Sequence, residues 1–418
     1  MYLEANLKQH LHIQKMPPRK TKHDLKRRML QKLAERKGEK KICLNMIVKN
    51  EEKNMTRLLD SLQTIIDMVS IVDTGSTDNT VNVIEEWGRN HKIPTMVHHE
   101  PFRDFAHNRT HSIRQAKASF PDADYFLLSD ADMIWEIKPE FSKKLLIDHK
   151  YLVEQHNPFM TYWNIRLLSA NVDWECVGVT HEYWNECGKQ GTYCGEVRVG
   201  KLHNICIDDK EDGGCKEDKF PRDERLLKTA LEDTELPTGL RLRYYFYLAQ
   251  TLRDMHRYEE SIEYYQKRVD GGGWPEEVYY AMYQIGRNYE MISNKTEDLT
   301  IKDQLRDSAM KHYLEAYRFR ETRAEALLSA SRLARNRSRH KESLDLALIG
   351  RTIPFSQDSL FVEKPAYEYA FDFEICICAY YVPDMKLEGV RACERLLSRD
   401  DLTPNFRSLV EHNSRFYV

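Results

Sequence analysis

The sequence predicts an α/β fold with a mostly parallel, helix-covered sheet, followed by an all-α domain of helical repeats. In the first half, apolar runs of strand length alternate with segments whose apolar residues recur every three or four positions. In the second half the helical rhythm continues, and small residues recur at matching places in successive helix pairs. Strands that alternate with helices are typical of parallel sheets, because each parallel connection needs a crossover.

The α/β half is expected to begin at residue 42. Apolar runs predict four strands, over residues 42–48, 69–72, 95–98 and 125–128. Apolar residues at helical spacing predict helices between these strands, over residues 55–62, 81–87 and 106–118. Gly75 marks the turn after the second strand, where Ser76, Thr77 and Asp78 are candidate caps for the next helix.

From about residue 221 the sequence predicts helix pairs only. Four pairs align on small residues: Ala249 with Ser261, Gly286 with Ala309, Ser331 with Ser343, and Ile377 with Gly389. The spacing from Ala309 to Ser343 equals the period of tetratricopeptide repeats, which stack into a superhelix with a peptide-binding concave face. We therefore expect three regions: a basic extension (1–40), the α/β domain (41–220) and a tetratricopeptide-like repeat domain (221–418).

Charge and apolar content limit the location and the partners. The 63 Lys and Arg residues nearly balance the 66 Asp and Glu residues, which argues neither for nor against any partner. The basic stretch over 19–41 is interpreted as a solvated arm, so no nucleic-acid partner is expected. No apolar stretch of transmembrane length and no secretory signal is visible, and the nine cysteines are interpreted as reduced. These features predict a cytoplasmic protein.

Acidic residues gather at the predicted ends of the strands. Asp73 ends the second strand, Asp130 and Asp132 follow the fourth, and an Asn-Glu-Glu turn over 50–52 follows the first. Ligands of open α/β sheets bind beyond the carboxyl ends of the strands. Each residue alone would pass for a turn or cap residue, but their order along the chain indicates one site.

These residues belong to a series of motifs that resembles the family 2 glycosyltransferases with the Rossmann-like GT-A fold. The motifs are Ile42-Cys-Leu-Asn-Met-Ile-Val-Lys-Asn-Glu-Glu52, Val72-Asp-Thr-Gly-Ser-Thr-Asp-Asn-Thr80, Phe105-Ala-His-Asn-Arg109, Tyr125-Phe-Leu-Leu-Ser-Asp-Ala-Asp132 and, after Trp174, Val179-Thr-His-Glu182. The resemblance covers about residues 42–220. Bacterial peptide S-glycosyltransferases of the SunS kind share the general layout with C-terminal tetratricopeptide helices.

The resemblance implies a divalent cation, Mn²⁺ or Mg²⁺, that neutralises the diphosphate leaving group. Asp132 would be its direct ligand, and Asp130 would bind the ribose or reach the metal through water. His203 is a candidate third ligand, and the equally weighted alternative is a hydrogen-bonded histidine at a strand end.

The resemblance also implies a nucleoside-diphosphate sugar as donor, with UDP-sugar the first choice. Asp73, together with Asn50 and the carboxylate of Glu51 or Glu52, would hold the uracil and ribose. Arg109 would form bidentate hydrogen bonds with the diphosphate, and its alternative reading is a surface helix charge.

Relatives of this kind invert the anomeric carbon in one displacement, which needs a general base. Glu182 is the leading candidate and His181 the alternative. The sequence departs from the common pattern in having Thr74 where many relatives have a second Asp, and a Gln-x-x-Arg-Trp motif of processive synthases is not found.

We therefore expect transfer of one sugar, of the hexosyltransferase class, to a protein, peptide or glycan acceptor, with a possible homo-oligomer through the repeats. Two alternatives stay open: an interaction scaffold whose nucleotide-binding domain is inactive, and a nucleotidyltransferase, although the Gly-rich phosphate loop of that class is not visible over 42–62.

Overall fold

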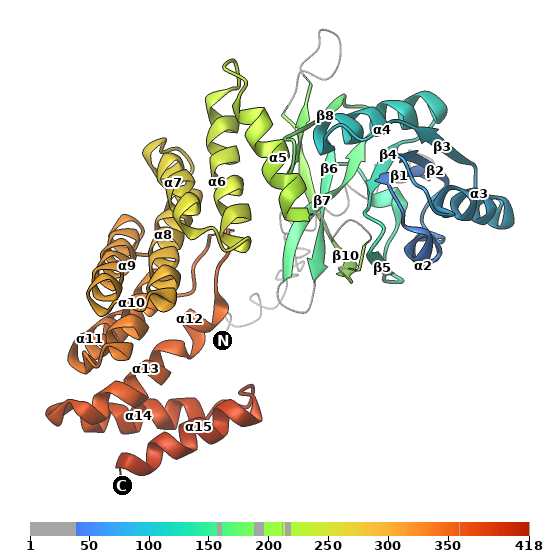
Figure 1. The fold of residues 1–418 in the computed structure, drawn as a ribbon. Helices are drawn as coiled ribbons and strands as arrows, with labels where there is room; N and C mark the ends of the chain where they lie inside the picture. Colours follow the sequence, from blue (N-terminus) through green and yellow to red (C-terminus); the bar gives the residue numbers. More distant parts are fainter. Residues whose placement is uncertain are drawn as a thin grey trace, which may run out of the picture. The chain divides into compact units, whose positions relative to one another are not determined.

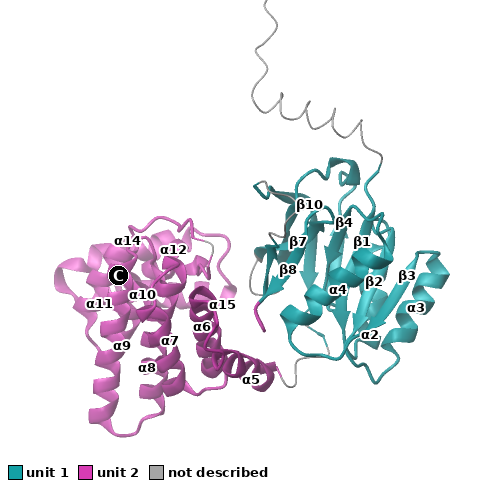
Figure 2. Ribbon diagram, turned by 90° about the horizontal axis from the view of Figure 1, so that it is seen from above, with its two compact units in different colours: residues 1–177, 182–217 teal, residues 178–181, 218–418 magenta. Residues whose placement is uncertain are grey.

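The computed structural model describes residues 39–156, 161–187, 196–210, 212–213, 219–358 and 360–417. The chain divides into two compact units (Figure 2). Unit 1 comprises Met1–Val177 and Glu182–Glu217, and unit 2 comprises Gly178–His181 and Asp218–Val418. The proposed extension over residues 1–40 lies outside the described residues except for its last two.

Unit 1 is built around an eight-stranded sheet with the strand order β3-β2-β1-β4-β7-β6-β10-β5 (Figure 1). Its strands are β1 (Ile42–Val48), β2 (Met68–Asp73), β3 (Thr95–His99), β4 (Tyr125–Leu128), β5 (Met133–Ile137), β6 (Lys150–His156), β7 (Thr161–Ser169) and β10 (Val199–Asp209). A separate hairpin pairs β8 (Trp174–Val177) with β9 (Tyr183–Glu186).

The four strands that the sequence predicts form the parallel half of this sheet. β1 pairs with β2 and with β4, and β2 pairs with β3, all in parallel. The predicted helices connect these strands as α2 (Glu52–Leu62), α3 (Thr80–His91) and α4 (Phe105–Ser119). The other half is mixed, because β7 is antiparallel to both β4 and β6, and β10 is parallel to β6 but antiparallel to β5. The predicted α/β class with a mostly parallel sheet is confirmed.

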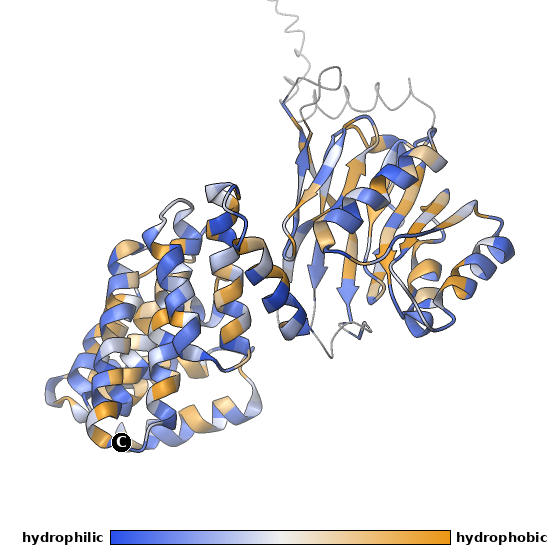
Figure 3. Cartoon of the chain, turned by 45° about the horizontal axis from the view of Figure 1, so that its top comes forward, coloured by the Kyte–Doolittle hydropathy of each residue, from blue (hydrophilic) through white to orange (hydrophobic). Residues whose placement is uncertain are grey.

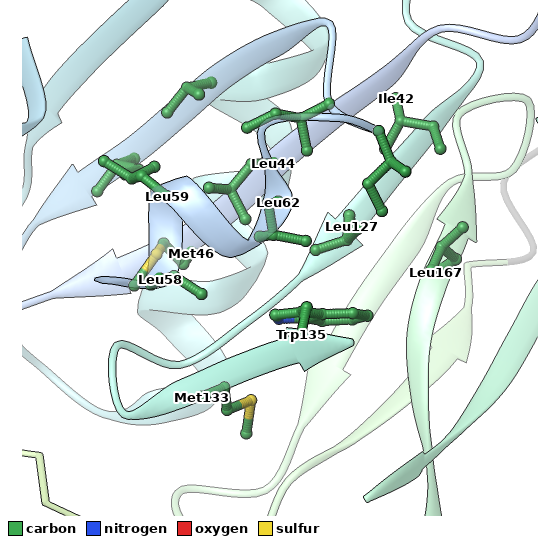
Figure 4. Packing of buried hydrophobic residues seen from close by; sticks show 14 of the residues in the cluster. Ile42, Leu44, Met46, Leu58, Leu59, Leu62, Leu127, Met133, Trp135 and Leu167 are labelled. Carbon is green, nitrogen blue, oxygen red and sulfur yellow. The ribbon is translucent and has the colours of Figure 1, made fainter. Parts of the chain in front are cut away.

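Both faces of the parallel half are covered, which explains its near-continuous apolar strands. Successive residues of β4 alternate between two cores: Leu127 packs with α2 on one face, and Phe126 packs with α4 residues on the other. Figure 4 shows the first core, where the ring of Trp135 lies beside Leu62 and Leu127. This packing fixes the strand ends at which the site lies.

Unit 2 consists of helices (Figure 1). They are α5 (Lys219–Leu231), α6 (Thr238–Asp254), α7 (Tyr258–Asp270), α8 (Pro275–Lys295), α9 (Leu299–Phe319), α10 (Glu325–Asn336), α11 (His340–Gly350), α12 (Lys364–Glu368), α13 (Ala370–Cys378), α14 (Lys386–Leu397) and α15 (Pro404–Ser414). Short 3₁₀ turns lie at Lys143–Leu145 of unit 1 and at Ala379–Tyr381, Pro383–Met385 and Arg415–Tyr417 of unit 2. The predicted all-α, tetratricopeptide-like region is confirmed.

The small residues of the predicted repeat meet at helix crossings. The Ser261 hydroxyl donates to the backbone oxygen of Ala249 at 2.7 Å, and the hydroxyls of Ser331 and Ser343 lie 3.0 Å apart. Apolar residues form stripes on these helices and are frequent in some of the strands of unit 1, while other strands are largely hydrophilic (Figure 3). In the part of the chain that the structure describes, no helix combines the length and the apolar content that a bilayer crossing requires.

Candidate functional site

The strand register brings the predicted acidic residues to one edge of the sheet. Val48, the last residue of β1, pairs with Asp73, the last residue of β2. On the other side of β1, Asn45 pairs with Leu128, the last residue of β4, so the loop that begins at Ser129 runs alongside the end of β1. The turns after β1, β2 and β4 therefore share one rim, as the sequence predicts.

The first two turns are hydrogen-bonded to each other. The Asn50 side-chain oxygen accepts from the backbone N–H of Thr77 at 2.7 Å, and the Asn50 N–H donates to the Ser76 hydroxyl at 2.9 Å. Asn50 has a left-handed backbone, with φ of 54°, which asparagine tolerates better than most residues. The Glu51 N–H donates to the Thr80 hydroxyl at 2.8 Å. These contacts give Asn50 a positioning role within the rim.

The carboxylates of Glu52 and Asp73 also accept hydrogen bonds from backbone N–H groups in these turns. The Glu52 carboxylate accepts from the N–H of Asn79 at 3.2 Å. The buried Asp73 carboxylate accepts from the backbone N–H groups of Gly75 and Ser76 at 3.2 and 3.1 Å, and its Oδ2 lies 3.4 Å from Nδ1 of His99. Asp73 thus anchors the loop after β2 at the rim.

Asp132 is the carboxyl of the rim whose pKa is raised. Burial, followed by the negative charges of Asp130 and Asp209, raises its pKa to about 6, and Glu51 contributes to the same shift. The chain after β10 packs against it: the Lys210 N–H donates to the backbone oxygen of Asp132 at 3.1 Å. An excess of negative charge in a partly buried place favours binding of a cation.

The loop after β10 approaches Asp132 closely at Gly213. A Cβ atom on Gly213 would lie 3.0 Å from Oδ2 of Asp132 and 3.3 Å from Oε1 of Glu51. Arg57 of α2 holds this loop through Asp212, with Nη1–Oδ2 and Nη2–Oδ1 distances of 2.8 and 2.6 Å. The acidic segment over 208–214 contributes Asp209 and Gly213 to the rim, while its residues 211 and 214 lie outside the described part.

Asp130 lies between two arginines. Arg109 Nη2 donates to Oδ1 at 2.7 Å, and Arg166 Nη1 donates to Oδ2 at 3.2 Å. Burial acts to raise the pKa of Asp130, but the two guanidinium groups outweigh it and hold the pKa well below its usual range. Asp130 therefore stays ionised, and its negative charge contributes to the raised pKa of Asp132.

Arg109 also contacts the predicted general base. Its Nε lies 2.5 Å from Oε1 of Glu182, and both side chains are mostly buried. His181, the alternative base, belongs to unit 2, where its ring stacks on Tyr247 with a centroid distance of 4.0 Å. Burial and the charges of Lys219 and Arg243 lower the pKa of His181 to about 4, so the ring is neutral at neutral pH. The structure joins Glu182, and not His181, to the rim of unit 1.

His203 is not brought to the rim. The register of β10 with β5 runs from Ile205 opposite Ile137 to Asp209 opposite Met133, so His203 lies beyond the far end of β5. Four residues of regular strand, about 13 Å, already separate Ile205 from Asp209, and His203 lies beyond Ile205. His203 packs against the Trp163 ring and lines a cavity of about 1580 Å³ at the amino ends of the strands. The structure therefore does not bring His203, the candidate third metal ligand, to this rim; His203 lies in the interior of β10.

Comparison with known proteins assigns the first part of unit 1. Residues 43–146 match the family described as glycosyl transferase family 2. The chain carries a family 2 glycosyltransferase domain. It is similar to uncharacterized glycosyltransferases of Rickettsia felis, 30% identical over 117 residues, and Rickettsia conorii, 31% identical over 117 residues. These matches cover 28% of this chain and 35% and 36% of the relatives, so the chain spans about a third of the length of the relatives it matches.

Solved structures show remote likenesses. Staphylococcus aureus TarS 1–349 in complex with UDP is 15% identical with a TM-score of 0.30, covering 66% of this chain and 91% of that one. A tetratricopeptide protein of Thermus thermophilus is 11% identical with a TM-score of 0.33, covering 47% and 90%. Glucosyl-3-phosphoglycerate synthase of Mycobacterium tuberculosis, with Mn²⁺ and UDP-glucose, is 17% identical with a TM-score of 0.21, covering 31% and 47%.

Unit 1 contains three further side chains, outside the matched segment, that the sequence analysis did not place at the site: Gln155, Arg166 and Asp209. Gln155 of β6 donates to Oδ2 of Asp209 at 2.8 Å, and its amide oxygen accepts from Nη2 of Arg166 at 2.8 Å. With Asp130 and Arg109, these groups form a hydrogen-bonded chain across β4, β7, β6 and β10. The sequence could have indicated Gln155, because it continues the alternation of buried residues in β6 that begins with Tyr151 and Val153, yet it is polar.

The rim of the family 2 domain fits a divalent cation with few protein ligands. Among the described residues, no three His, Cys, Asp or Glu side chains converge at metal-binding geometry. Asp132 nevertheless lies close enough to Asp130, Asp209 and Glu51 for their charges to raise its pKa. Mg²⁺ commonly binds one or two carboxylates and completes its shell with water and substrate phosphates. The donor set at this rim is of that kind.

Proposed function

We propose that this chain transfers one sugar from a nucleoside-diphosphate sugar, in the first place a UDP-sugar, to an acceptor with inversion at the anomeric carbon. The observation that carries the proposal is the gathering of Asp73, Asp130 and Asp132 at one rim within the family 2 domain. Ligands of open α/β sheets bind at this edge. The carboxylates provide the means to hold a cation and a ribose there.

Asp132 is our candidate for the direct ligand of Mn²⁺ or Mg²⁺, with Asp130 bound through water or to the ribose. When bound, the cation would neutralise the negative charge that develops on the departing diphosphate. Gln155 holds Asp209 beside Asp132, so Asp209 adds to the negative field at that point. Asp73 and the Asn50–Glu52 turn would contact the base and ribose of the nucleotide.

Glu182 is our candidate for the general base. Its carboxylate lies next to Arg109, which also contacts Asp130, so it adjoins the place where the diphosphate would bind. A base in this position would accept the proton of the acceptor as the new glycosidic bond forms and the bond to the phosphate breaks. Such a group contributes about 10²–10⁴-fold in rate.

The helical repeats of unit 2 favour a protein or peptide acceptor over a free sugar. Stacked helix pairs of this class present extended concave surfaces, which suit a peptide or a helix. A glycan acceptor is the second choice within the same proposal, and the repeats could also join two copies of the chain.

Donor cleavage tests the proposal. Purified protein is incubated with UDP-, GDP- and dTDP-sugars plus Mn²⁺, and released nucleoside diphosphate is measured. We expect slow hydrolysis of one donor, and we expect Asp132→Asn to abolish it because the cation loses its ligand. Asp122→Asn is the matched control, since this exposed carboxylate pairs with Lys41 at the opposite edge of the sheet. Unchanged hydrolysis by Asp132→Asn would refute the metal assignment.

A further inference from the structure

Arg109 of α4 lies between the candidate base and the candidate donor site. Its Nη2 lies 2.7 Å from Oδ1 of Asp130, and its Nε lies 2.5 Å from Oε1 of Glu182. The Arg109 side chain is 16% exposed and that of Glu182 17%, so water screens this pair only in part. Two carboxylates from distant parts of the chain thus share one arginine.

The two contacts of Arg109 differ in quality. The contact with Asp130 is an aligned hydrogen bond, and Arg166 holds the other oxygen of Asp130 at 3.2 Å. The contact with Glu182 is close, but Nε of Arg109 is a buried donor without a well-aligned hydrogen bond. Misaligned bonds are weak even at short distance. Glu182 is therefore held mainly by charge, and this contact is the easier one to exchange.

Charge balance shows why the exchange would matter. Arg109 and Arg166 together balance Asp130 and Glu182, whereas Asp132, Asp209 and Glu51 add negative charge beside them. A carboxylate oxygen that contacts a guanidinium is not free to face the hydrogen of an acceptor, so Glu182 must leave Arg109 before it can act. A diphosphate with its cation would bring new acceptor oxygens to the same place, and the planar fork of arginine matches phosphate oxygens well.

We propose that Arg109 exchanges partners when the donor binds: in the free protein it holds Glu182, and in the donor complex it turns to the diphosphate and releases Glu182 as the base. This inference rests on the proposed function and deepens it. Arg109 restrains the base until the donor is in place. The acceptor proton then passes to Glu182, the acceptor atom bonds to the anomeric carbon, and the electron pair of the broken bond leaves with the diphosphate.

The exchange predicts opposite effects of two substitutions on nucleotide affinity. UDP with Mn²⁺ is titrated into the full chain by calorimetry, which requires no turnover. Glu182→Gln removes the competitor for Arg109 without changing shape, so UDP should bind about three- to tenfold more tightly. Arg109→Gln removes the partner of the diphosphate, so UDP should bind at least about tenfold more weakly. The same Glu182→Gln protein should lose sugar transfer.

Controls separate this proposal from simpler ones. Glu186→Gln removes an exposed carboxylate at the end of β9, the strand that follows Glu182, and should leave UDP affinity unchanged. Arg109→Lys keeps a positive charge if Arg109→Gln unfolds, and it too should weaken UDP binding because it lacks the fork. If Glu182→Gln binds UDP with the wild-type affinity or more weakly, Arg109 is a fixed brace and the exchange is refuted. If the wild-type chain binds no UDP, GDP or dTDP, the proposed function itself fails.

Discussion

Asp132 is a candidate metal ligand whose carboxyl is destabilised in its ionised form when no cation is bound. Its carboxylate is the best candidate to hold a cation, yet without a cation it lies among Asp130, Asp209 and Glu51, which raise its pKa to about 6 together with burial. A raised carboxyl pKa means that the folded state binds the proton more tightly than the unfolded chain does. The site therefore stores electrostatic repulsion that the bound cation would relieve.

This repulsion predicts a pH-dependent effect of Asp132→Asn on stability. Below about pH 3 the carboxyl is largely protonated in both the folded and the unfolded state, so the substitution should change the free energy of unfolding little. The wild type loses stability between about pH 4, where the unfolded chain ionises, and about pH 6, where the folded carboxyl ionises. Above about pH 6 the variant should therefore be more stable by on the order of 1 to 2 kcal/mol. Urea unfolding of both proteins without metal across this range measures the difference.

A constant difference at all pH values would contradict the origin of the effect. Excess Mn²⁺ at neutral pH should reverse the order of stability, since only the wild type retains the ligand.

At the scale of the elements, the helices of unit 2 depend on small residues where they cross. α8 and α9 pack closely because Gly286 faces α9: a Cβ atom there would lie 2.6 Å from the Tyr313 ring and 3.2 Å from the backbone oxygen of Ala309. Tyr313 is fully buried and its hydroxyl donates to Glu290 at 2.7 Å, so the ring has little room to move. The periodic small residues of the sequence thus mark helix contacts.

Gly286→Ala should therefore destabilise unit 2, although alanine is the better helix former. Overpacking costs typically about 1–3 kcal/mol, which exceeds the gain of up to about 1 kcal/mol in helix propensity. Gly239→Ala in α6 is the matched control, because a Cβ atom there meets nothing within 4 Å. Thermal unfolding followed by circular dichroism should show a lower melting temperature for Gly286→Ala only. Equal melting temperatures for both variants would contradict the close packing.

At the scale of the whole molecule, each unit has its own buried core. The clusters around Leu44 and Phe126 belong to unit 1, and those around Phe246, Tyr279 and Ile375 belong to unit 2. A unit with its own core can unfold as a cooperative body. The short segment Gly178–His181 is grouped with unit 2, so the chain passes between the units more than once.

Separate cores predict two unfolding transitions in calorimetry. UDP with Mn²⁺ should raise the melting temperature of one transition only, that of unit 1, because a ligand stabilises the body that binds it. Gly286→Ala should lower only the melting temperature of the other transition, that of unit 2. A single transition that UDP and the glycine substitution both shift would show that the units unfold together.

Local patterns were sufficient for the parallel half of the sheet and for the helix pairs. Strand β1 and helix α4 follow from apolar periodicity, which depends on neighbouring residues alone. The positions of Asp73 and Asp130 follow as well, since the carboxyl ends of neighbouring parallel strands meet at one edge. The unit boundary near residue 218 lies close to the change of pattern after residue 220.

Pairings between distant segments could not be read in this way. The place of His203 could not be predicted because its location depends on which end of β10 meets β5, and the register is set by packing of the whole sheet. Gln155 and Asp209 lie far apart in the sequence and meet only because β6 and β10 are neighbours. The same holds for Arg109 and Glu182, whose contact requires α4 and the β8–β9 hairpin to be folded together.

The amino-acid sequence by itself determined the fold class, the repeat character of the second half and the edge of the sheet at which the carboxylates gather. These features arise from hydrophobic periodicity and turn chemistry, which act over a few residues. Only the tertiary structure decided which charges touch, because ion pairs and hydrogen bonds form between segments that strand order and helix packing bring together.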